Sequence, residues 1–173
     1  MSVSPPVSQA SAHHSVVIVG GGQAGLSLSY YLQQRSIDHL VIEKQSPMHA
    51  WRNQRWDAFS LVTPNWQCAL PGWPYAGNDP HGFMKKDEIL DYLEGFRQHV
   101  NAPQLTDTLV QRVGRRGASG FEVSTSAGSF TADQVVVASG GYHQPIIPRM
   151  EIGRARVGKE CLRLCRSRWS PYH

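Results

Sequence analysis

The 173-residue chain lacks several features that would assign it at once to a class of protein. Its longest aliphatic run, Val16 to Val19, is far short of the roughly 20 residues of a membrane span. The first 14 residues have no apolar core and no early positive charge, so they do not form a secretory signal. The three cysteines (Cys68, Cys161 and Cys165) lack the spacing of a zinc site, and we expect no metal. Reduced thiols and a cytoplasmic location are therefore predicted.

Net charge is also missing from most of the chain. Residues 1–150 hold 11 Lys plus Arg and 11 Asp plus Glu, so the whole net charge of +4 comes from residues 151–173. Basic residues there lack aromatic neighbours apart from Trp169, which argues against nucleic acid as a partner. A basic amphipathic helix is one explanation of this segment. We favour the other, a truncated or frame-shifted product, because the composition changes abruptly.

Glycine, in contrast, is concentrated after the first apolar run. The stretch VVIVGGGQAGLSLSYYLQ covers residues 16–33. Residues 15–19 predict a short buried parallel strand, residues 23–35 predict a helix, and residues 39–44 predict a second buried strand. Strand, helix and strand within about 30 residues form a βαβ unit with a right-handed crossover.

The three glycines Gly20, Gly22 and Gly25 match the pattern G-x-G-x-x-G. The first glycine makes a tight turn, the second removes a side chain that would block a pyrophosphate, and the third allows close packing of helix on strand. Glu43 ends the second strand, where a carboxylate binds ribose hydroxyls and disfavours a 2′-phosphate. A glycine-rich turn beside an ordinary surface Glu is the alternative, but the surrounding elements favour nucleotide binding.

The rest of the chain predicts a mixed fold. Residues 45–82 are rich in proline, hold four of the five tryptophans and have no lasting periodicity. Residues 85–100 predict a helix, and residues 109–115, 121–125 and 129–131 predict a small three-stranded β-meander. Residues 134–141 repeat the pattern of a buried strand followed by glycine. We therefore expect an α/β fold: a disordered tail at 1–14, a Rossmann-like domain at 15–149 that binds a dinucleotide, and a basic tail at 150–173.

At this point the sequence resembles the class B flavin-containing monooxygenases and, more broadly, the two-dinucleotide-domain flavoproteins. The resemblance covers residues 15–149 and rests on six stretches: GGGQAG (20–25), EK (43–44), WR (51–52), LVTPN (61–65), KKDEILDYLEGF (85–96) and VVVASGGYHQPIIP (135–148). It implies FAD as cofactor. NADPH in this family binds a second glycine fingerprint, which residues 149–173 do not contain.

The resemblance also implies roles for individual residues. Asn65 is the one catalytic candidate, and an ordinary turn position is its alternative. Trp51 is alternatively a core residue, and Arg52 a solvated surface charge. The implied cofactor-binding residues are Gly20, Gly22, Gln23, Ala24, Gly25, Glu43, Lys44, Trp51, Arg52, Thr63, Val113 and Gly140.

The sequence thus predicts the FAD-binding portion of an NADPH-using, monooxygenase-like oxidoreductase that acts on a small molecule. We expect this chain alone to be catalytically incomplete. We also expect an exposed apolar surface where the missing domain would dock, which would bind a partner or cause aggregation. Another two-domain flavoprotein is the runner-up, which the lack of a C-x-x-C near the flavin region disfavours. A non-catalytic nucleotide-binding remnant is the third alternative.

Overall fold

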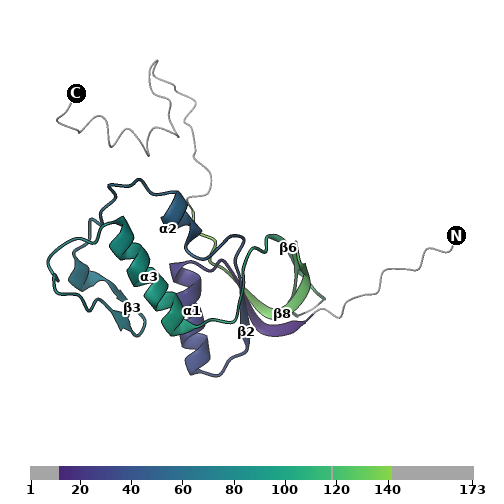
Figure 1. Cartoon of the computed structure of the whole chain (residues 1–173). Helices are drawn as coiled ribbons and strands as arrows, with labels where there is room; N and C mark the ends of the chain where they lie inside the picture. The colour runs from purple at the N-terminus through teal and green to yellow at the C-terminus, as the bar shows by residue number, and fades with distance from the viewer. Residues whose placement is uncertain (1–11, 118, 142–173) are drawn as a thin grey trace, which may run out of the picture. The chain divides into compact units, whose positions relative to one another are not determined.

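The computed structural model of the chain describes residues 12–117 and 119–141 (Figure 1). The chain divides into two compact units. Among the described residues, the sheet unit comprises those up to Pro47 together with Val100–Ser139, and the insert unit comprises Met48–His99 together with those from Gly140. The predicted tails at 1–14 and 150–173 lie largely or wholly outside the described residues.

The sheet unit is built on one six-stranded sheet with the order β5-β2-β1-β8-β7-β6. Strands β5, β2, β1 and β8 run parallel to their neighbours, whereas β7 and β6 continue the sheet in antiparallel fashion. Helix α1, Gln23–Gln34, connects β1 to β2, as the glycine-rich stretch predicts. The strand bounds are His13–Val19 (β1), His39–Ile42 (β2), Gln104–Leu105 (β5), Val110–Arg115 (β6), Phe121–Thr125 (β7) and Gly128–Val137 (β8).

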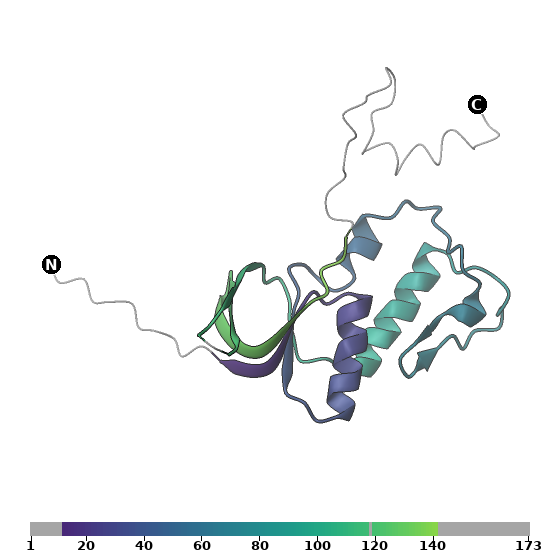
Figure 2. The same ribbon diagram turned by 180° about the vertical axis from the view of Figure 1, so that it is seen from behind.

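Strand β8 corrects the strands that were predicted between residues 129 and 141. The sequence predicts two strands, at 129–131 and from 134, but the structure has one continuous strand of ten residues. Its first half pairs with β7, and its second half pairs with β1 in an unbroken register that ends at Val19 and Val137. The exposed Asp133 interrupts the apolar pattern, but the pairs on either side of it, His14 with Ala132 and Val16 with Gln134, keep the same register. The meander and the parallel sheet are therefore one surface, along which β8 curves without a break (Figures 1 and 2).

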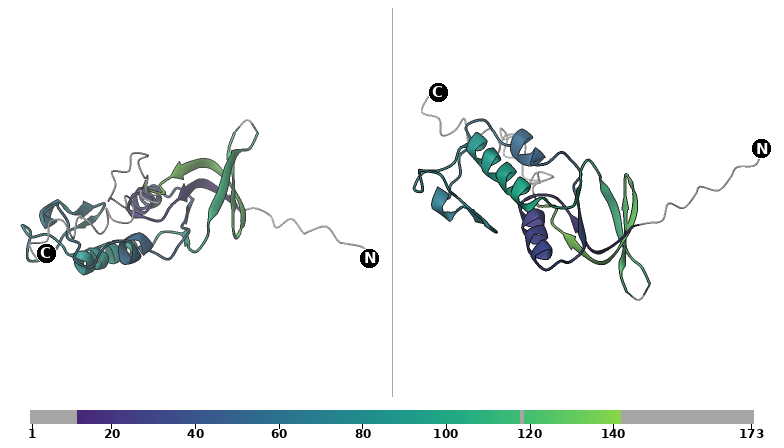
Figure 3. Two further views of the ribbon diagram at one scale, coloured as in Figure 1. Left: turned by 90° about the horizontal axis from the view of Figure 1, so that it is seen from above. Right: turned by 60° about the horizontal axis from the view of Figure 1, so that its bottom comes forward.

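The core of the sheet unit lies on both faces of β1, as the alternation of a strand buried on two sides requires. One cluster of buried residues shares a face with the meander, and the other contacts α1. Figure 3 shows α1 and the meander strands from two further directions. The first cluster is Val17, Ile42, Val123 and Ala132; the second is Val16, Ile18 and Val41, against which Leu28 and Leu32 of α1 pack.

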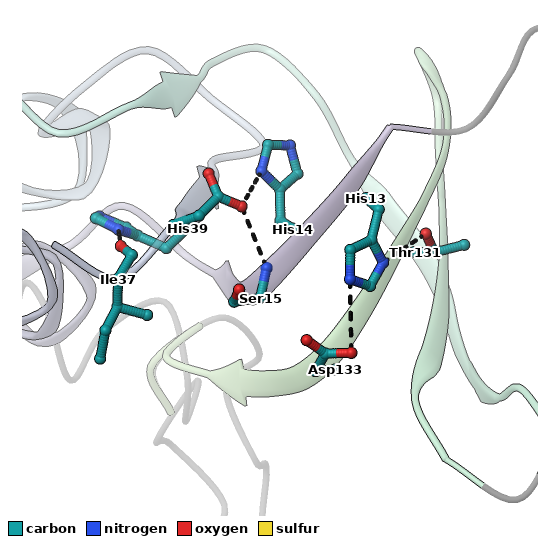
Figure 4. A network of polar contacts seen from close by, with 8 residues as sticks. His13, His14, Ser15, Ile37, His39, Thr131 and Asp133 are labelled. Atoms are coloured by element: carbon teal, nitrogen blue, oxygen red, sulfur yellow. Dashed lines mark hydrogen bonds and ion pairs between the residues drawn. The ribbon is translucent and has the colours of Figure 1, made fainter.

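Two histidines fix the start of β1 to its neighbours through carboxylates (Figure 4). His13 Nε2 lies 3.5 Å from Asp133 Oδ1, and His14 Nδ1 lies 3.0 Å from Asp38 Oδ2. Burial alone would raise the pKa of Asp38, but the backbone N–H of Ser15 and the neighbouring His14 together hold it below its ordinary value. These contacts lie at the amino end of β1, away from its glycine turn.

A buried polar pair links α1 to β2. Ser29 Oγ lies 2.7 Å from His39 Nε2, and both side chains are buried. His39 Nδ1 lies 2.9 Å from the carbonyl oxygen of Ile37, a contact drawn in Figure 4. In the neutral ring, Nδ1–H donates to that carbonyl and Nε2 accepts from the Ser29 hydroxyl. The pair is inaccessible to substrate and acts as a link between helix and strand.

The insert unit contains the predicted long helix and short elements. Helix α3, Lys86–Val100, matches the prediction and buries Ile89, Leu93 and Phe96. Glu88 Oε2 caps its first turn by accepting from Lys85 N at 2.7 Å. Residues 45–82, predicted to be irregular, hold short elements: α2 (His49–Asn53), the 3₁₀ turn η1 (Asn65–Gln67), β3 (Ala69–Leu70) and β4 (Trp73–Pro74).

Tyr92 of α3 anchors the β3–β4 hairpin. Its hydroxyl donates to the carbonyl of Trp73 at 2.7 Å and accepts from Leu70 N at 3.1 Å. Trp73 Nε1 donates back to the carbonyl of Tyr92 at 3.2 Å.

None of the helices in the described part of the chain has the length and apolar character to cross a bilayer.

Candidate functional site

The first glycine of the motif sits where β1 turns away from the sheet. Gly20 has φ +111°, a conformation that other residues rarely adopt, and its N–H donates to the carbonyl of Ile42 at 2.8 Å. A Cβ on Gly20 would lie 2.5 Å from the carbonyl oxygen of Ala138, which follows β8. Backbone conformation and space both require glycine here, at the carboxyl ends of β1, β2 and β8.

Gly25, the third glycine of the motif, is closely surrounded by other atoms, whereas Gly22, the second, lies beside open space. A Cβ on Gly25 would overlap the carbonyl oxygen of Gly20 and lie 3.4 Å from Ile18 Cγ2, so glycine lets α1 pack closely on β1. A Cβ on Gly22 would meet no atom of the described residues within 4 Å. Gly22 has extended backbone and is exposed, so the protein itself does not require glycine there. The free space beside it fits a ligand that approaches the main chain.

Helix α1 begins at this open position without a side-chain cap in the described structure. Gln23 and Ala24 form its first turn, and both are exposed. The first N–H groups of a helix have no intrahelical partner, and the helix dipole makes this end attractive to anions. An uncapped N-terminus beside Gly22 therefore fits the phosphates of a dinucleotide.

Glu43 faces the glycine loop from the end of β2. Its Oε2 accepts from the N–H of Gly21 at 2.7 Å, and its Oε1 accepts from the N–H of Gln45 at 3.1 Å. Its backbone is held by Leu105 and Thr108, since Glu43 N donates to the first and its carbonyl accepts from the second. A carboxylate has about four lone-pair sites, so two remain for sugar hydroxyls. One loop amide is nevertheless already occupied by the protein.

Lys44 and Val113 complete the predicted site residues of the sheet unit. Lys44 is exposed and follows Glu43 directly. Val113 lies on β6, where it pairs with Val123, and is 39% exposed. β7 and β8 separate it from β1 in the sheet, and its role beside an adenine stays a prediction.

The remaining predicted residues belong to the insert unit. Arg52 is exposed, and its Nη2 lies 3.6 Å from Glu94 Oε2. Trp51 packs edge-on against Phe59 with ring centroids 5.7 Å apart, and the guanidinium of Arg55 lies 4.8 Å from its ring. Trp51 is thus half-buried in an aromatic cluster, and its place beside the cofactor stays a prediction. Arg55, which the sequence reasoning did not single out, is the cation that stacks on it.

Asn65 is buried, and its side chain bonds to the backbone of its own unit. Its Oδ1 accepts from Met84 N at 2.8 Å, and its Nδ2 donates to the carbonyl of Asp79 at 2.8 Å. These bonds give Asn65 a structural role, and its catalytic role stays a prediction. Thr63 and Gly140 are exposed, and Gly140 has φ +77°.

The parallel sheet, the glycine turn at its carboxyl edge and the acidic end of β2 define a Rossmann-like dinucleotide-binding domain, as predicted. The chain belongs to the pyridine nucleotide-disulphide oxidoreductase family, whose profile matches residues 17–161.

Comparison with individual proteins narrows this assignment. An uncharacterised CzcO-like oxidoreductase of Geobacillus kaustophilus is 40% identical over 134 residues, which cover 77% of this chain and 38% of the relative. An indole-3-pyruvate monooxygenase of Arabidopsis thaliana is 26% identical over 78% of this chain and 34% of its own length. A solved flavin-containing monooxygenase from Stenotrophomonas maltophilia superposes with a TM-score of 0.73 at 29% identity, covering 81% of this chain and 42% of that protein.

These relatives confirm the resemblance to class B flavin-containing monooxygenases and a flavin-dependent oxidoreductase lineage. The chain spans about two fifths of the length of the first of them. Activity, substrate and partners of a complete protein are therefore matters for proposal.

Proposed function

We propose that this chain is the FAD-binding portion of an NADPH-using, monooxygenase-like oxidoreductase that acts on a small molecule in the cytoplasm. The observation that carries the proposal is the bare position at Gly22. Free space there adjoins an uncapped helix N-terminus, and Glu43 faces the same loop. This combination suits a diphosphate joined to a ribose.

Bound FAD would supply the redox chemistry, because protein side chains cannot carry hydride or activate oxygen themselves. Gly20, Gly22 and Gly25 would shape the pyrophosphate loop, and Gln23 and Ala24 would present first-turn amides to it. The carboxylate of Glu43 would accept from the adenosine hydroxyls. The other predicted contacts, from Lys44, Trp51, Arg52, Thr63, Val113 and Gly140, with Asn65 near the reacting end, belong to the same proposal.

Substitution of Gly22 tests this proposal directly. Gly22→Val places a side chain where a diphosphate would lie, and its Cβ would have no atom of the described residues within 4 Å, so we expect unchanged thermal unfolding and a loss of FAD affinity of at least about 100-fold. Gly114→Val is the matched control, because Gly114 lies on β6 and, apart from its chain neighbours, the nearest described atom to an added Cβ is Arg112 Nε, at 3.9 Å. Titration of FAD fluorescence measures both. Equal affinity of Gly22→Val and wild type would contradict the site.

Catalytic incompleteness is the second part of the proposal. The supporting observations are the absence of another G-x-G-x-x-G from the sequence and the 38% coverage of the CzcO-like relative. We expect the FAD-loaded chain to stay oxidised when NADPH is added without oxygen, while dithionite reduces it. Bleaching of the flavin absorbance by NADPH would contradict this part and leave FAD binding intact.

The third part of the proposal is that the insert unit carries an interface for the rest of a full-length family member, and an apolar surface supports it. Residues 60–66 and 80–85 run side by side, because Leu61 N donates to Met84 O at 2.9 Å and Ser60 bridges to Lys85. Three large apolar side chains on these segments are exposed: Val62 (94%), Phe83 (50%) and Trp66 (57%). We propose that the remainder of a full-length family member covers them, since such patches mark interfaces.

The isolated chain should then self-associate through this surface. Combined Val62→Lys and Phe83→Lys substitutions are expected to shift light-scattering masses to the monomer without loss of helix content. Tyr31→Lys, an exposed apolar position in the sheet unit, is the control. A chain that is monomeric without any substitution would contradict the proposed surface.

A further inference from the structure

The glycine loop contains an amide that is not free to bind a phosphate. Glu43 Oε2 accepts from the N–H of Gly21 at 2.7 Å, so the carboxylate meant for a sugar is bonded to the loop itself. A diphosphate that takes the Gly21 amide must displace this bond. A displaced carboxylate needs another donor, because leaving an ionised group without a hydrogen bond destabilises the folded protein.

Gln104 holds a donor without a partner at this place. It lies on β5, beside β2, and its Nε2 atom is buried with no hydrogen-bond partner in the described structure. A Cβ built on Gly21 would overlap this Nε2 atom and lie 3.1 Å from Glu43 Cβ. The amide nitrogen and the stem of Glu43 therefore flank the same point.

An unpartnered buried amide is costly, and a side chain kept only to fill space would more often be apolar. Because the Gln104 amide nitrogen and the Glu43 stem flank one point, rotation of the Glu43 side chain would carry its carboxylate toward this amide. The rotation would leave the Gly21 N–H to the ligand and would supply Gln104 with its missing acceptor.

We propose that Gln104 is a positioning residue of the nucleotide site. It receives the Glu43 carboxylate when the nucleotide takes the Gly21 amide, and it fixes that carboxylate toward the sugar. The inference rests on the proposed FAD binding and adds a residue that lies 61 positions from Glu43 in the chain.

Gln104→Met is the variant that separates this role from packing, because methionine has similar length and no donor. We expect the flavin-free Gln104→Met chain to unfold at the wild-type temperature or slightly above it, since a buried unpaired group is removed. Its dissociation constant for FAD should rise about tenfold, the effect of one hydrogen bond to a charged group. Gln134→Met, at an exposed position on β8, is the matched control and should bind like wild type.

A double-mutant cycle with Glu43→Gln shows that Gln104 acts through the carboxylate. Once Glu43 is replaced, Gln104→Met should have no further effect on FAD affinity. Equal FAD affinity of wild type and Gln104→Met would overturn the inference, as would fully additive losses in the double variant. A wild-type chain that binds no FAD would overturn the proposed function with it, so the two failures are distinguishable.

Discussion

Gly25→Ala offers a sharp test of the packing at the glycine turn. The added Cβ would overlap the carbonyl oxygen of Gly20 and lie 3.2 Å from its carbon. Both atoms belong to the backbone of a turn that Ile42 and Ala138 already hold in place. Neither neighbour can move aside as a flexible side chain would, so α1 must shift away from β1.

The size of the effect follows from two opposing contributions. Overpacking against a fixed backbone costs about 3 kcal/mol. Replacing glycine by alanine inside a helix returns about 1 kcal/mol. The net loss of about 2 kcal/mol should lower the melting temperature by roughly 4–8 °C.

Thermal unfolding followed by circular dichroism, without flavin, measures this loss. Ser27→Ala is the control, because it lies on the same helix, is half-buried and gains helix propensity without the clash. A Gly25→Ala chain as stable as the Ser27→Ala chain would refute the reasoning. It would mean that the close approach of α1 to β1 is not set by this glycine.

Three further predictions concern stability. Ser29→Ala leaves His39 Nε2 buried without its partner, and urea unfolding should show a loss of about 1–2 kcal/mol. Asn65→Ala removes two bonds to backbone groups, and the same measurement should show a loss of about 2–3 kcal/mol, with little change in α-helical signal. The side-chain bond from Arg97 holds the pKa of Glu94 below 4.5, so this carboxylate stabilises the fold above that pH and the contribution is lost as pH falls through the lower folded pKa. Glu94→Gln should therefore flatten the acid limb of a stability–pH curve below about pH 4.5 and lower stability near pH 7; an unchanged acid limb would contradict the assignment.

The elements that the sequence predicts well are those with local causes. The turn at Gly20, helix α1 and strand β2 follow from glycine spacing and a run of apolar residues, which act over a few positions. Helix α3 follows from an apolar stripe of the same kind. Strand β5 has only two residues, Gln104 and Leu105, and exists because β2 offers it a free edge. No local pattern could have shown it.

The sequence predicts which residues belong to the candidate site, but it does not predict the contacts between strands that lie side by side. The facing of Glu43 toward the loop agrees with the motif. The bond from Gly21 to that carboxylate and the unpaired amide of Gln104 depend on which strand lies next to β2, which the sequence does not state. Arg55 was missed for a similar reason, because its place over Trp51 and Phe59 follows from a short turn rather than from a motif.

The shared strand β8 has a consequence for the order in which the protein forms during synthesis. β1 acquires its second parallel neighbour only from residues 131–137, and Gly20 meets Ala138 more than a hundred residues after it leaves the ribosome. Because such distant pairings form slowly, the nascent chain carries an unfinished glycine loop until nearly the whole described domain has emerged. Under the proposed function, FAD would therefore take no part in the early steps of folding and would bind firmly only after residue 138 has been translated.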